Sequence, residues 1–80
     1  MAKRDDLVDW VQEALLYYNG SASIVRVCRY VWNNYEEELR RSGDLFYTWQ
    51  YAIRWAATYL RSKGVMLNTD ASPKGIWKLK

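Results

Sequence analysis

Apolar positions recur along most of the chain with the period of an α-helix. Apolar side chains three or four residues apart form one stripe at about residues 6–18, a second at about 24–41 and a third at about 48–63. Two short strand-like runs then flank a loop rich in Asn, Asp, Ser and Pro, which is typical of a β-hairpin at about residues 65–79. The pattern predicts a mainly α fold with a small C-terminal β-hairpin.

Local signals indicate where these helices begin and end. The pair Asn19-Gly20 is a helix stop, Ser23 is the expected N-cap of the second region, and Thr48 is the expected N-cap of the third helix. The second region is either one long helix or two pieces divided at residues 33–34, and we favour a break or kink there, where Asn34 could cap the second piece.

The composition restricts the possible chemistry. The chain has 80 residues, no His and a single cysteine, Cys28. A chain of this length forms one domain, residues 1–80, with no large enclosed cavity. We therefore expect no catalytic site, metal, cofactor or small-molecule substrate, and no disulfide within the chain. With no leader-like or membrane-spanning run, we expect a soluble cytoplasmic protein that does not enter a membrane.

Half of the residues are apolar, and the 5 Trp and 7 Tyr supply much of the candidate core. Trp49 and Trp77 lie on apolar stripes and are expected to be buried. Cys28 also lies on such a stripe, where a thiol serves as a small apolar filler. Trp55 falls off the main stripe and could pack beneath the hairpin, whereas Tyr51 is expected to project outward.

Charge is divided unevenly between the two ends of the chain. Residues 1–20 hold two basic and four acidic side chains, whereas residues 44–80 hold six basic and two acidic ones. A net charge of +3 is ordinary for solubility, but the basic end coincides with the third helix and the hairpin. Basic side chains gathered on one surface neutralise phosphates and release counterions, so this end is a candidate nucleic-acid surface.

The third helix and the hairpin supply the candidate DNA contacts. Candidates for contact with base edges in the major groove are Gln50, Tyr51, Arg54 and Thr58. Candidates for contact with phosphates are Arg61, Lys63 and Lys74. The alternative for the first set is a solvated helix face, and Arg61 and Lys63 also complement the dipole at the helix C-terminus.

The outward side of the second helix carries Arg26, Arg29 and Trp32. This set suits a helix that crosses a DNA backbone. It suits a protein interface equally well, because an exposed Trp beside arginines is the composition of a binding hot spot.

Two stretches resemble the N-terminal winged-helix domain of Mrr-type restriction endonucleases. They are residues 55–64, which carry a Trp-Ala pair and end at Gly64, and residues 72–79, which carry Ser-Pro, a lysine, a glycine and Trp77. The resemblance implies a winged helix-turn-helix that recognises DNA for a separate nuclease domain. The acidic residue and the Glu/Gln-x-Lys motif of that nuclease domain have no match in this chain.

The sequence therefore predicts a non-enzymatic winged helix-turn-helix domain that binds double-stranded DNA, with the third helix in the major groove and the hairpin on the backbone. A protein partner such as a nuclease subunit is compatible with that function. The alternative is a protein-interaction or dimerisation winged helix that uses the outward arginine and aromatic side chains.

Overall fold

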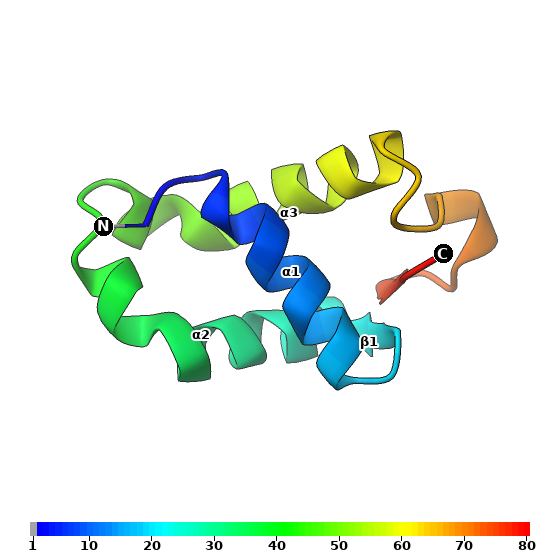
Figure 1. Cartoon of the computed structure of the whole chain (residues 1–80), viewed down its shortest axis with the longest axis horizontal. Helices are drawn as coiled ribbons and strands as arrows, with labels where there is room; N and C mark the ends of the chain where they lie inside the picture. The colour runs from blue at the N-terminus through cyan, green and yellow to red at the C-terminus, as the bar shows by residue number, and fades with distance from the viewer. Residues whose placement is uncertain (1) are drawn as a thin grey trace.

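Three helices make up most of the chain in the computed structural model, which describes residues 2–80 (Figure 1). Helix α1 spans Asp6–Tyr17, α2 spans Ile24–Arg40 and α3 spans Leu45–Ser62. The predicted ends of the first two helices agree with the structure to within one residue. The third begins three residues earlier than expected. Thr48 is thus not an N-cap: its hydroxyl donates to the carbonyl of Asp44 at 3.2 Å from within the first turn.

Helix α2 consists of two helical pieces that meet at a kink, as predicted. The backbone leaves helical geometry at Tyr35, with φ −130° and ψ 19°, one residue after the predicted division at 33–34. Asn34 does not act as the predicted cap: no backbone N–H among residues 2–80 donates to its side-chain oxygen, and its amide donates to the carbonyl of Tyr30 at 2.8 Å. At the start of the helix, Ser23 is the predicted N-cap: its hydroxyl oxygen accepts from the backbone N–H of Arg26 at 3.2 Å.

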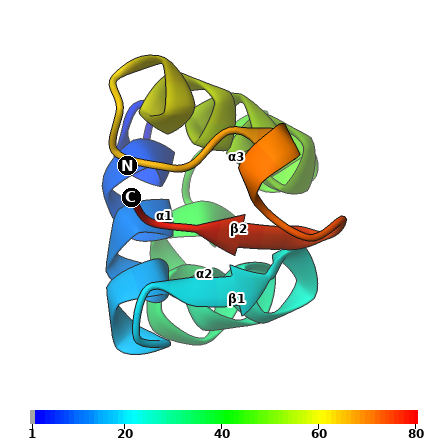
Figure 2. The ribbon, with the colours of Figure 1, turned by 90° about the vertical axis from the view of Figure 1, so that its right-hand side faces the viewer.

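A small antiparallel sheet joins the segment after α1 to the C-terminal end of the chain. Strand β1, Ser21–Ser23, pairs with β2, Ile76–Lys78, and places Ala22 opposite Trp77 (Figure 2). The predicted hairpin contributes a further antiparallel bridge between Met66 and Leu79. The mainly helical fold with a small antiparallel sheet is confirmed. Strand β1 is the part of the sheet that the sequence pattern did not predict.

The turn before β1 needs left-handed backbone geometry. Asn19 has φ 64° and Gly20 has φ 95°, and the N–H of Gly20 donates to the carbonyl of Leu15 at 2.6 Å. Only glycine adopts such angles without steric cost, so the Asn-Gly pair both ends α1 and turns the chain into the sheet. This confirms the predicted helix stop.

One hydrophobic core lies where α1 crosses in front of α2 and α3 (Figure 1). Trp49 and Trp77 are buried, as predicted. The largest side chains without exposed surface are Leu7, Leu15, Leu39, Ile53 and Met66. The core fixes one side of each helix, so the remaining side of α3 is free to face solvent.

Trp55 and Cys28 lie at the edge of the core rather than within it. Trp55 is partly buried against the core; the guanidinium of Arg4 lies over its ring, 4.1 Å from the ring centroid, and the ring of Tyr59 is 5.7 Å away. Cys28 is a free thiol that is only half-buried, at the edge of the core. It therefore lines a surface groove rather than filling an interior gap.

A carboxylate joins α1 to the kink of α2. Tyr30 and Tyr35 donate their hydroxyls to the two carboxylate oxygens of Glu13 at 2.7 and 2.6 Å. The ring of Tyr35 also stacks on Trp10, with centroids 4.1 Å apart and an interplanar angle of 8°. Hydrogen bonding to Glu13 is the main cause that raises the pKa of each tyrosine from 10.0 to about 12, and burial adds to it.

We expect the free energy of unfolding to fall as the pH rises from about 10 to about 12. The folded-state pKa of both tyrosines lies above the unfolded value, so their contribution is complete below pH 10 and is lost as the pH passes through about 12. Urea unfolding at pH 8, 10, 11 and 12, followed by circular dichroism, measures this loss.

The control is Glu13→Ala, which removes both acceptors. In this variant the decline above pH 10 should be shallower, and absorbance at 295 nm should show Tyr30 and Tyr35 ionising near pH 10. Identical decline in the variant and the parent protein would contradict a stabilising role for the Glu13 carboxylate.

Candidate nucleic-acid interface

The outward face of α3 carries all four predicted base-contacting side chains. Gln50, Tyr51, Arg54 and Thr58 are exposed, and 82% of the Tyr51 surface is accessible. The residues on the opposite side of the helix are buried: Trp49, Ile53, Ala56, Ala57 and Leu60. The hydroxyl of Thr58 donates to the carbonyl of Arg54 at 3.1 Å, which leaves its oxygen free to accept.

A groove separates the C-terminal half of α3 from the loop that leads into β2. We call it the loop groove; it has a volume of about 500 Å³. Arg54, Thr58 and Arg61 line it from the helix. Lys74 and Gly75 line it from the loop, and the carbonyl of Gly75 accepts from the N–H of Ile24 at 3.1 Å, which ties the loop to the start of α2. Three cationic side chains from two elements therefore face one groove.

Arg61 lacks a hydrogen-bond partner that its burial would normally require. Its Nε atom is buried, and among residues 2–80 no group accepts a hydrogen bond from it. A buried guanidinium N–H without an acceptor is costly. Arg61 also lines the loop groove, so its positive charge belongs to the cationic set around that groove.

Lys63 lies apart from the other predicted phosphate contacts. Its ammonium group sits over the ring of Tyr59, 5.5 Å from the ring centroid, and Lys63 does not line the loop groove. The structure thus brings Arg61 and Lys74 together, and does not bring Lys63 to them.

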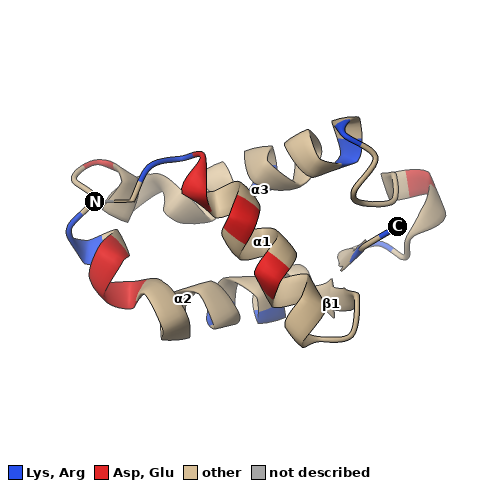
Figure 3. Cartoon of the chain, viewed as in Figure 1, with Lys and Arg blue, Asp and Glu red and all other residues tan. Residues whose placement is uncertain are grey.

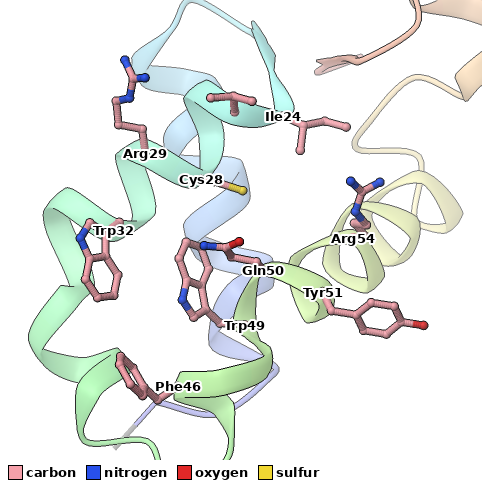
Figure 4. A pocket seen from close by; sticks show the side chains of 10 residues that line it. Ile24, Cys28, Arg29, Trp32, Phe46, Trp49, Gln50, Tyr51 and Arg54 are labelled. Carbon is pink, nitrogen blue, oxygen red and sulfur yellow. The ribbon is translucent and has the colours of Figure 1, made fainter.

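A second groove, which we call the interhelical groove, runs between α2 and α3 and has a volume of about 850 Å³ (Figure 4). Gln50, Tyr51 and Arg54 line it from α3, and Arg29 and Trp32 line it from α2. Since Arg54 also lines the loop groove, the two grooves meet at this side chain.

Two of the three residues of the predicted partner surface on α2 line the interhelical groove. Arg29 and Trp32 line it, whereas Arg26 is exposed outside it. Trp32 is half-buried rather than fully outward, because its ring stacks on Trp49 with centroids 6.1 Å apart.

The sequence reasoning missed Phe46 and Cys28 as groove residues. Both line the interhelical groove. Phe46 lies before the predicted start of the third helix at residue 48, so it was not placed on a helix face. An earlier helix start would have put Phe46, Trp49 and Gln50 at adjacent positions on α3. Burial raises the pKa of the Cys28 thiol, and the positive charge of Arg54 opposes that shift.

Within the described chain, acidic side chains lie along α1, near the end of α2 and in the short 3-10 helix Thr69–Ala71, but they are absent from the lining of both grooves. Acidic residues Asp6, Asp9 and Glu13 follow α1 in the view of Figure 3. In the described part of the chain, neither groove is lined by Asp or Glu. The ion pairs found within residues 2–80 join neighbours at the far end of α2, Arg40 to Glu36 and Arg41 to Glu37. The groove cations Arg29, Arg54, Arg61 and Lys74 are thus unpaired among the described residues.

The described residues show no group of three or more side chains placed to hold a metal ion, and no helix among them has the length and hydropathy to cross a bilayer. Comparison with protein-family models, curated protein sequences and solved structures returns no match. The case for a function therefore depends on the two grooves and their cations.

Proposed function

We propose that this chain is a winged helix-turn-helix domain that binds double-stranded DNA. Helix α3 lies in the major groove, where Gln50, Tyr51, Arg54 and Thr58 face base edges. The loop before β2 lies against the backbone, with Lys74 on a phosphate. The order of three helices, with a strand between the first two and an antiparallel return strand at the end, supports this fold.

The observation that carries the proposal is the convergence of Arg54, Arg61 and Lys74 on one groove without an acidic residue among its lining residues. Cations from a helix and from the loop beside it match two features of a duplex, its groove and its flanking phosphates. Arg61 has no acidic ion-pair partner among residues 2–80, which favours an anionic occupant of this groove.

The resemblance of residues 55–64 and 72–79 to the Mrr-type winged-helix domain supports the same function. It adds a role in the proposal: the chain brings a separate nuclease subunit or domain to DNA, and contributes no catalytic residue of its own. In this role the protein acts in the cytoplasm, together with the DNA that it binds.

A salt titration tests duplex binding directly. We expect a fluorescently labelled duplex of about 20 base pairs to bind at low salt. With Arg29, Arg61 and Lys74 each meeting a phosphate, the slope of log K against log salt should be about −2 to −3. A duplex that shows no anisotropy change at 20 mM salt would refute the proposal.

Lys74→Ala is expected to weaken binding several-fold for every duplex sequence and to reduce the salt slope by about 1. The reason is that a phosphate contact contributes affinity without reading sequence. Fluorescence anisotropy with two unrelated duplexes at several salt concentrations measures both effects.

Lys63→Ala is the matched control, because it removes the same charge from the end of α3 outside the loop groove. Its affinity and slope should stay within about twofold of the parent protein. Equal losses in the two variants would mean that total charge, rather than the loop groove, sets binding.

A further inference from the structure

The floor of the interhelical groove is more apolar than a DNA surface requires. Ile24, Cys28, Trp32, Phe46 and Trp49 line it, and Figure 4 shows the Cys28 sulfur directed from α2 toward α3. Phosphates and sugars are recognised by cations and hydrogen-bond donors. An aromatic floor of this kind instead favours an occupant with bulky apolar side chains.

The aromatic rings of this floor form a continuous pad. Trp32 stacks on Trp49 at an interplanar angle of 7°, and the ring of Phe46 is 6.4 Å from that of Trp32. The guanidinium of Arg40 lies 5.2 Å from the Trp32 centroid and 5.7 Å from that of Phe46, so it bounds the pad at one end. The pad is presented between two helices, which is the shape that accepts a third helix.

The rim of the groove is cationic. Arg29 rises from α2 and Arg54 from α3, and neither pairs with an acidic side chain among residues 2–80. In the view of Figure 4, both guanidinium groups stand at the edge of the groove rather than on its floor. The complementary occupant therefore carries acidic side chains beside an apolar ridge.

We propose that the interhelical groove binds an acidic amphipathic helix of a partner protein. Its apolar side chains lie on the Trp32, Trp49 and Phe46 pad, and its Asp and Glu side chains face Arg29 and Arg54. A second copy of this chain does not supply such a helix, because its acidic helix α1 has its apolar side, including Leu7 and Val11, buried in its own core. The inference does not rest on the proposed DNA function, although Arg29, Gln50, Tyr51 and Arg54 belong to both surfaces, so that the helix and a duplex would exclude each other.

Peptide selection without DNA tests this inference. A displayed library of random 16-residue peptides is selected against the full chain of 80 residues. We expect the enriched peptides to carry apolar residues at positions i, i+3 or i+4, and i+7, with an excess of Asp and Glu. Enriched peptides that lack this pattern, or a selection that enriches none, would overturn the proposal.

Charge reversal on α2 tests the site of binding. Arg29→Glu should weaken the best synthetic peptide at least tenfold in isothermal titration calorimetry. Arg41→Glu, an exposed change at the far end of α2, should alter affinity by less than threefold. Equal effects of the two reversals would place the peptide elsewhere and overturn the proposal. Circular dichroism checks that both variants stay folded.

Cys28 provides a second measurement that needs no variant. It is the only cysteine of the chain, and it lines the groove. A bound peptide should slow its reaction with a maleimide at least fivefold, and prior labelling should block peptide binding. A labelling rate unchanged by saturating peptide would overturn the proposal. A protein that binds such peptides but no duplex would sustain this inference and refute the DNA function.

Discussion

Replacing Arg54 with alanine is expected to weaken duplex binding more than any other single truncation on the surface. Arg54 lines both grooves and faces the centre of the proposed DNA surface. Loss of an arginine that pairs with a guanine edge costs about 1–3 kcal/mol, which is roughly 5- to 150-fold in affinity. Anisotropy titrations with the preferred duplex and with an unrelated duplex measure the loss and the change in specificity.

Arg54→Lys separates charge from base reading at this position. Lysine retains the positive charge but not the planar, bidentate donors. We expect this variant to bind the unrelated duplex nearly as well as the parent protein, while losing most of its preference for the selected sequence. Arg41→Ala removes a cation outside both grooves and should leave binding within about twofold. An Arg54→Ala loss no larger than that of Arg41→Ala would refute the central role of Arg54.

Trp77→Ala is expected to produce the largest loss of stability. Only 4% of the Trp77 surface is exposed, and the residue anchors β2 opposite Ala22 in β1. Truncating a buried tryptophan costs about 3–5 kcal/mol. A domain of 80 residues has a total stability of about 4–12 kcal/mol, so the variant should be partly unfolded at 25 °C. Urea unfolding followed by circular dichroism measures the loss.

The same change should disturb the loop groove, since Trp77 is one of its lining residues. Trp77→Phe keeps an apolar ring in the core and should cost less than the alanine change. Tyr51→Ala removes a side chain that is 82% exposed and should change the free energy of unfolding by no more than about 0.5 kcal/mol. A loss below about 1 kcal/mol for Trp77→Ala would show that the sheet contributes little to the fold.

Periodicity predicted the helices well because each buries one side against a common core. The stripe through Trp49, Ile53, Ala56 and Leu60 is buried, and the positions on the opposite face of α3 are exposed to solvent as expected. The start of α3 was wrong by three residues. Threonine is a residue type that often caps a helix, but α3 begins earlier, at Leu45, which packs against the core. Thr48 therefore lies within the first turn.

The candidate site was predictable in part. The residues on α3 were identified because helical geometry alone places Gln50, Arg54 and Thr58 on one face. Lys63 is only two residues beyond Arg61, yet it lies over Tyr59 and outside the loop groove. Residues two apart on a helix point to nearly opposite sides, so helical spacing already separates Lys63 from the face that carries Arg61.

The sequence by itself determined the number, order and approximate limits of the helices, the buried positions of Trp49 and Trp77 and the outward face of α3. These features follow from periodicity and local capping, which act over a few residues. Only the tertiary structure decided that Ser21–Ser23 is a strand. These small residues have no β-propensity of their own, and they form a strand because their backbone pairs with that of β2. It also decided that Arg29, Arg54 and Lys74 gather around two adjoining grooves, since contacts between distant segments depend on how the helices pack.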